Sequence, residues 1–187
     1  MWKLLGGIVL GLLVAMGLAF SMMDKLMFKE VQSPFGMEET VARIQHNIAN
    51  NPELKAKGWS LSGLRNPAKA VQADGSNVLP VMMIEACSTK YSKPILQEDT
   101  VRFLSILMPC KISVYKKNDG KVYIGTMNAG LMGKLFGPLV GEVMGKVAED
   151  QKKFVVFDPK TPAPKMIMPA PPAGATPGGS GGGGGGC

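Results

Sequence analysis

The segment from Lys111 to Met127 reads KISVYKKNDGKVYIGTM and predicts a β-hairpin. At residues 118–120 it contains Asn-Asp-Gly, a turn sequence whose glycine takes the position that requires a positive φ. A three-residue loop pairs Val114 with Ile124 on one face and leaves the two tyrosines together on the other. A two-residue loop would put Val114 opposite Tyr123 and mix the faces, so we expect the longer turn.

Strand and helix patterns precede the hairpin. Alternating or continuous apolar residues predict three strands, at Lys25–Gln32, Trp59–Leu64 and Asn77–Ala86. Apolar residues at helical spacing predict a helix over Met37–Asn51, and a shorter helix is expected within Ile95–Leu107. The next strand begins at Pro109-Cys110, which leads into the hairpin.

A second long helix is expected from Asn128 to Lys152. Four glycines recur in it at every fourth residue: Gly133, Gly137, Gly141 and Gly145. Each glycine lowers helix stability relative to alanine, and Pro138 lowers it further, so packing must hold this helix. Because a glycine strip lets the backbone approach a sheet or another helix, we expect close packing within the fold or across a homodimer.

The predicted elements give an α+β fold. Their order is β-α-β-β-(α)-β-β-α, and Phe154–Phe157 could add a last short strand before the tail. This order is typical of a single antiparallel sheet with two main helices packed on one face. The domain covers residues 24–158, which is long enough for one hydrophobic core without a disulfide scaffold.

An apolar run precedes the domain. Leu4–Met23 contains no charged residue and has the length that an α-helix needs to cross a bilayer, so residues 1–23 are predicted to be a membrane anchor or a signal peptide. Small residues share one face of such a helix, where another helix could approach: Gly7, Gly11, Ala15 and Ala19. We favour a retained helix in the inner (cytoplasmic) membrane, with the domain facing the periplasm or the exterior. The alternative is cleavage near Ser21, which gives a secreted or periplasmic protein.

The other end of the chain differs from the domain in composition. Residues 159–187 read PKTPAPKMIMPAPPAGATPGGSGGGGGGC and are predicted to be a disordered Pro/Gly-rich tail. The tail ends in a thiol, Cys187. Three interpretations stay open for it: an intermolecular disulfide or attachment point, an incidental terminal residue, or a cloning remnant.

Charge and composition argue against several classes of function. The net charge is +7, but the Lys and Arg residues are scattered and no aromatic array accompanies them, so no nucleic-acid partner is expected. The single histidine, His46, excludes any site that needs a histidine pair. The P-loop and H-E-x-x-H motifs are absent from the sequence, and an enzyme is the less favoured class.

Several motifs in a fixed order resemble one known family. They are SPFGMEETVARI, GWSLSGL, NVLPVMMIEACSTKYSKPIL, RFLSILMPCKISVYKKNDGKVYIGTMNAGLMGKLFG and VGEVMGKVAED. In this order the chain resembles domain of unknown function 302, in its membrane-associated form, over roughly Lys25 to Asp150. The resemblance implies a TATA-binding-protein-like arrangement of sheet and helices and a dimer, and it implies no reaction. Where that family often has Cys-Asn-Pro, this chain has Cys87-Ser88-Thr89.

Two cysteines form the one constellation that could carry chemistry. Cys87 ends the third strand and Cys110 begins the next, so antiparallel pairing would bring them together. Our leading hypothesis is a structural disulfide, worth about 3 kcal/mol. The alternative is a redox or metal site, because neighbouring cations lower thiol pKa values and because thiolates with the thioether of Met108 suit Cu(I). The sequence identifies no cofactor.

Three hypotheses for function follow. The first is a membrane-tethered binding or assembly module of the cell envelope, homo-oligomeric and without established catalysis. The second is a thiol-based redox, sulfur-carrying or copper-handling protein that uses Cys87 and Cys110. The third is a binder of a small apolar ligand, because a groove often lies between a sheet and its helices.

Overall fold

The computed structural model of the chain describes residues 6–7, 10–14, 16–17 and 23–168. The small-residue face predicted for the N-terminal run lies only partly within these residues, and Cys187 lies outside them. Within the described part of the chain, no helix is both long enough and apolar enough to cross a membrane.

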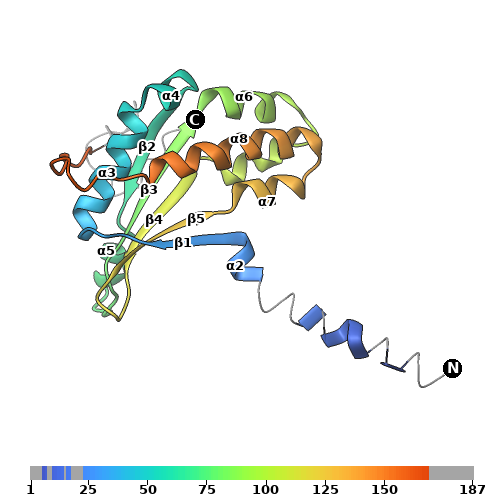
Figure 1. The fold of residues 1–187 in the computed structure, drawn as a ribbon, viewed down its shortest axis with the longest axis horizontal. Helices are drawn as coiled ribbons and strands as arrows, with labels where there is room; N and C mark the ends of the chain where they lie inside the picture. The colour runs from blue at the N-terminus through green and yellow to red at the C-terminus, as the bar shows by residue number, and fades with distance from the viewer. Residues whose placement is uncertain (1–5, 8–9, 15, 18–22, 169–187) are drawn as a thin grey trace.

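A five-stranded antiparallel sheet forms the domain, in the order β1-β5-β4-β3-β2 (Figure 1). Its strands are β1 Phe28–Gln32, β2 Trp59–Arg65, β3 Val81–Ser88, β4 Cys110–Lys116 and β5 Val122–Met127. The β4–β5 hairpin has the expected register, with Val114 opposite Ile124, and Gly120 in its turn has a φ of 79°. The predicted α+β fold with one antiparallel sheet is therefore confirmed. The TATA-binding-protein-like arrangement stays a prediction.

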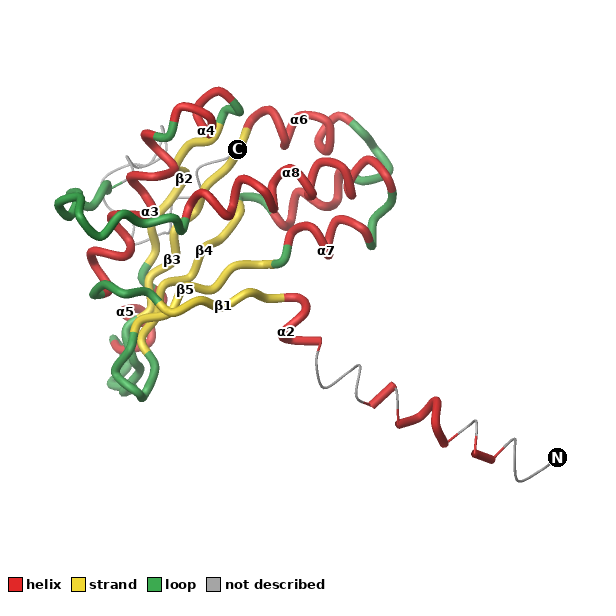
Figure 2. Tube along the Cα trace, in the orientation of Figure 1, coloured by secondary structure: helices red, strands yellow, loops and turns green. Residues whose placement is uncertain are grey.

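Helices occupy the connections between strands. They are α2 Met23–Met27, α3 Met37–Asn50, α4 Pro52–Ala56, α5 Pro67–Gln72, α6 Thr89–Gln97, the 3-10 helix η1 Arg102–Leu107, α7 Ala129–Lys134 and α8 Pro138–Phe154. Figure 2 shows α3 and α8 crossing the same face of the sheet. The apolar side chains of these two helices and of the strands form one core, which includes Val41, Ile44, Ile84, Ile112, Val147 and Phe154.

Two of the predicted helices have different bounds in the structure. The helix expected within Ile95–Leu107 begins earlier, at Thr89, because the side chain of Ser88 accepts a hydrogen bond from the amide of Tyr91 and caps the first turn. It is followed by the separate helix η1. The predicted strand at Phe154–Phe157 is wrong, because Phe154 is the last residue of α8 and is fully buried.

The long helix predicted from Asn128 to Lys152 is two helices. The first helix, α7, ends at Lys134. Gly137 then has a φ of 90° in the turn, and Pro138 begins α8. The chain reverses here, so α7 packs against α8 (Figure 1). A Cβ atom on Gly133 would lie 2.5 Å from the Cβ of Met144, and one on Gly141 would lie 3.7 Å from the carbonyl oxygen of Gly133. These two glycines thus let α7 and α8 approach within one chain, whereas a Cβ on Gly145 would meet open space.

The first residues of the predicted tail lie against α3 rather than apart from the domain. The guanidinium of Arg43 donates to the carbonyl oxygens of Asp158 and Thr161, at 3.1 and 2.8 Å. The amide of Gln45 exchanges two hydrogen bonds with the backbone of Ile167, at 2.7 and 2.9 Å. The prediction of disorder from Pro159 onward is therefore wrong for the stretch from Pro159 to Ile167.

Candidate functional site: an apolar pocket

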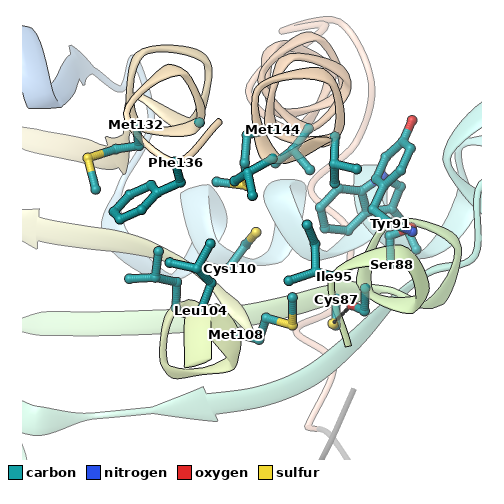
Figure 3. A pocket seen from close by; sticks show the side chains of 17 residues that line it. Cys87, Ser88, Tyr91, Ile95, Leu104, Met108, Cys110, Met132, Phe136 and Met144 are labelled. Atoms are coloured by element: carbon teal, nitrogen blue, oxygen red, sulfur yellow. Dashed lines mark hydrogen bonds between the residues drawn. The ribbon is translucent and has the colours of Figure 1, made fainter. Parts of the chain in front are cut away.

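A pocket lies where the ends of β3 and β4 meet the helices α6, η1, α7 and α8. Its lining is almost entirely apolar and comprises Trp59, Cys87, Ser88, Tyr91, Ser92, Ile95, Leu104, Leu107, Met108, Cys110, Met132, Gly133, Phe136, Val140, Val143, Met144 and Val147. Figure 3 shows the sulfur of Cys110 directed into this space. No charged side chain lines it.

The two-helix hairpin described above builds the upper wall of this pocket. Phe136 follows α7 and Met144 lies on α8, and both contact a small cluster of buried residues formed by Ile95, Leu104, Val140 and Val143. The opposite wall comes from η1 and from Met108 (Figure 3). The pocket therefore exists only because the chain reverses at Gly137.

The pocket is small. Its free volume is about 50 Å³, which exceeds the space needed by one water molecule but is far below the several hundred Å³ of a typical drug-sized site. Three methionines line it, Met108, Met132 and Met144. Methionine is unbranched and rotates freely, so a lining of this kind adapts its shape to a ligand.

Cys110 is the one titratable thiol that the structure directs into the pocket. Burial raises its pKa to about 11, and the nearby charge of Lys111 opposes this only weakly. The thiol is therefore protonated at neutral pH, the opposite of what the redox hypothesis requires.

The predicted disulfide between Cys87 and Cys110 is wrong, because Cys110 is a free thiol. The strand register gives the reason. Cys110 pairs with Ala86, the residue before Cys87, and neighbouring residues of a strand point to opposite faces of the sheet. Both cysteines border the pocket, and the sulfur of Cys87 lies 3.2 Å from the hydroxyl oxygen of Ser92. Within the described residues, no group of three or more His, Cys, Asp or Glu side chains could hold a metal ion.

A buried carboxylate borders the pocket behind its aromatic residues. Asp150 of α8 is fully buried and accepts hydrogen bonds from the ammonium of Lys57 at 2.5 Å, the indole of Trp59 at 2.9 Å and the hydroxyl of Tyr91 at 3.0 Å. Burial alone would raise its pKa, but these three donors together hold it below the usual range. Both carboxylate oxygens thus accept hydrogen bonds, and Asp150 fixes the aromatic wall of the pocket.

Sequence reasoning missed most of this site. Cys87, Cys110 and Met108 were the predicted candidates, and all three line the pocket. Phe136 and Met144 were missed because a single straight helix would not fold their segments together. The dipeptide Gly137-Pro138 is a helix-stop and helix-start signal that could have revealed the reversal.

The chain is similar to known proteins in both sequence and structure. A family model described as "Domain of unknown function DUF302" matches residues 29–155, which include every residue that lines the pocket. The crystal structure of an uncharacterized conserved DUF302 protein from Bacillus stearothermophilus is similar, with a TM-score of 0.58 and 21% identity over 69% of this chain and 95% of that one. At this identity the likeness shows the fold. No curated protein matches the chain significantly.

Proposed function

Because this chain belongs to the DUF302 family, whose description names no activity, we propose from its own geometry that it is a non-catalytic binding module for a small apolar ligand. We also propose that it is a membrane-associated member, tethered to the inner membrane by residues 1–23. The tether is supported by the uncharged run Leu4–Met23.

One observation carries the ligand proposal: the pocket has free space, and no charged side chain lines it. An engineered apolar cavity of about 150 Å³ binds benzene or xenon. At about 50 Å³, this pocket takes a single small apolar group as it stands, and larger ones only when its methionines move. The ligand class is therefore a small apolar molecule or the end of an acyl chain.

Xenon tests this proposal, because it is a single apolar atom that needs no specific hydrogen bond. The full chain is placed in lipid nanodiscs with ¹³C-labelled methionine methyl groups, and NMR spectra are recorded under xenon pressure. We expect saturable shifts for Met108, Met132 and Met144. Met37 packs against the separate main core and is expected to shift much less.

A filled variant makes the test specific. Val143→Phe places a larger side chain in the pocket wall and should abolish the xenon shifts. Val156→Phe makes the same substitution at an exposed position and should leave them unchanged. Equal shifts at all methionines, or shifts that persist in Val143→Phe, would contradict ligand binding in this pocket.

Copper handling is the second candidate, favoured by one thiol and three thioethers around the same pocket. The raised pKa of Cys110 counts against it, because a metal must displace that proton. Titration with Cu(I) against a competing chelator tests this candidate, with Cys110→Ser as the control.

Homo-oligomerisation stays a prediction, and sedimentation of the full chain at several concentrations tests it.

A further inference from the structure

We propose that the uncovered face of the sheet rests on an anionic lipid bilayer through a groove lined by β1, β3, β4, β5 and η1. This inference rests on the tether in the proposed function and is independent of the apolar pocket. The groove has a volume of about 1080 Å³ and lies on the face opposite α3 and α8.

The strand register explains why the face is hollow. Gly125 of β5 lies between Glu30 of β1 and Ser113 of β4, so small side chains form the floor of the groove. The segment from Ile106 to Pro109 forms one wall, and α2 with β1 forms the other. Figure 1 shows α2 at the point where the chain enters the domain.

The charges of the groove favour an anionic partner. Four lysines and one glutamate line it. The glutamate, Glu30, is already neutralised by Lys117 at 2.6 Å and accepts a hydrogen bond from the hydroxyl of Tyr115. Lys25 and Lys111 form no salt bridge with any described residue. Lys29 pairs with Thr126 on the helix-covered face, where its charge interacts with Glu149 of α8. The groove therefore offers two cations, Lys25 and Lys111, that no described carboxylate pairs with.

Apolar side chains stand beside these cations. Phe28 is 62% exposed and Ile106 is 80% exposed, and both line the groove. Leu26 on the neighbouring helix α2 is 53% exposed. Large exposed apolar residues rimmed by lysines are the pattern of a surface that inserts into the interface of an anionic membrane.

Two facts favour a bilayer over a second copy of the chain. Lys25 lines the groove and follows the uncharged run by two residues, so a tether that ends at Met23 would hold this end of the groove close to the membrane surface. Two copies that faced each other through the groove would instead bring two surfaces of net positive charge together, which is unfavourable.

Hydrogen exchange of the full chain in nanodiscs tests the proposal. Discs contain either phosphatidylcholine alone or phosphatidylcholine with about one third phosphatidylglycerol. A lysine near an anionic surface contributes about fivefold to binding, so we expect the amides of residues 23–30 and 101–107 to exchange at least about threefold more slowly in the anionic discs. The amides of α3, on the opposite face, should be unaffected.

Matched charge variants identify the residues responsible. The variant Lys25→Glu, Lys111→Glu should lose the protection. The control Lys55→Glu, Lys165→Glu changes the net charge equally on exposed residues away from the groove and should keep it. Equal exchange in both kinds of disc overturns the proposal, as does protection in neutral discs that rises with protein concentration, which indicates a second copy.

Incorporation of the chain into neutral discs tests the tether separately from the groove. A chain that does not incorporate is floated with vesicles of the two lipid compositions. Flotation with anionic vesicles alone then supports the docking face without the tether, and equal behaviour with both compositions overturns it.

Discussion

At the scale of single residues, Asp150 links elements that are far apart in the sequence. Its carboxylate receives donors from the segment after α4, from β2 and from α6, and the residue itself lies on α8. Because both carboxylate oxygens accept hydrogen bonds, the negative charge of Asp150 is tolerated in a buried position. Removing the charge leaves three buried or half-buried donors with a weaker acceptor.

We expect Asp150→Asn to lower the free energy of unfolding by about 2–3 kcal/mol. Urea denaturation monitored by circular dichroism measures this. Glu149→Gln is the matched control, because the carboxylate of Glu149 makes only an exposed ion pair with Lys152, and exposed pairs contribute little to stability. Similar losses in the two variants would show that Asp150 does not hold the helices together.

The pH dependence of stability should also depend on Asp150. Its pKa is lower in the folded protein than the ordinary value of 3.8, so the carboxylate contributes stability above about pH 4 that disappears as the pH falls through the folded pKa. We expect the wild-type protein to lose more stability than Asp150→Asn between pH 5 and pH 3. Urea midpoints for both proteins across this range test the expectation, and parallel curves would contradict it.

Cys110 should react slowly with alkylating reagents. Because its pKa is about 11, the thiolate is scarce at pH 7.5, and we expect iodoacetamide to modify it at least about a hundredfold more slowly than a free cysteine. The rate should rise about tenfold per pH unit between pH 8 and pH 10. Mass spectrometry of the tryptic peptide that contains Cys110 measures the rate. Fast modification at pH 7.5 would instead support the redox hypothesis.

At the scale of elements, the turn between α7 and α8 decides the shape of the pocket. The four-residue spacing of glycines predicts close packing, and the structure places two of the glycines where the two helices meet. The remaining two have other surroundings: Gly137 has a positive φ in the turn and Gly145 faces open space.

Alanine substitutions should separate these roles. Gly133→Ala brings a Cβ to 2.5 Å from the Cβ of Met144 and 2.9 Å from the carbonyl oxygen of Val140, so we expect a loss of about 1–3 kcal/mol in unfolding free energy. Gly145→Ala adds its Cβ in open space within α8 and should stabilise the protein by about 0.5–1 kcal/mol. Denaturant midpoints that shift in the same direction for both variants would contradict this packing.

At the scale of the whole molecule, the segment after α8 returns across the domain. Arg43 binds Asp158 and Thr161, stacks its guanidinium 4.2 Å from the ring centroid of Phe35, and so joins three parts of the chain. Phe35 in turn packs edge-on against Phe157. The returning segment thus closes over α3 and partly covers the core through Met166.

Arg43→Ala should release this segment. We expect trypsin to cleave after Lys160 and Lys165 at least about tenfold faster, because each lost hydrogen bond to a charged group is worth about 1.5–3 kcal/mol. Mass spectrometry of the early cleavage products measures this. Arg102→Ala removes an arginine whose hydrogen bonds lie within the connection from α6 to η1, and it should leave these two cleavages unchanged.

Local patterns in the sequence are enough for some of these features. The register of the β4–β5 hairpin follows from its turn and from the alternation of its side chains, and the bounds of α3 follow from its apolar spacing, because both depend on residues close together in the chain. Cys110 and Met108 could be selected as site candidates for the same reason, as sulfur side chains next to a strand start.

The tertiary structure alone decided the rest. It placed Cys87 and Cys110 on opposite faces of the sheet, since a register of one residue sets the face. It folded α7 onto α8 and so created the pocket, and it brought Lys57, Trp59 and Tyr91 to Asp150 across more than fifty residues of chain. The local sequence pattern of one segment does not predict which other segment it contacts. Burial and charge pairing depend on which surfaces meet in three dimensions.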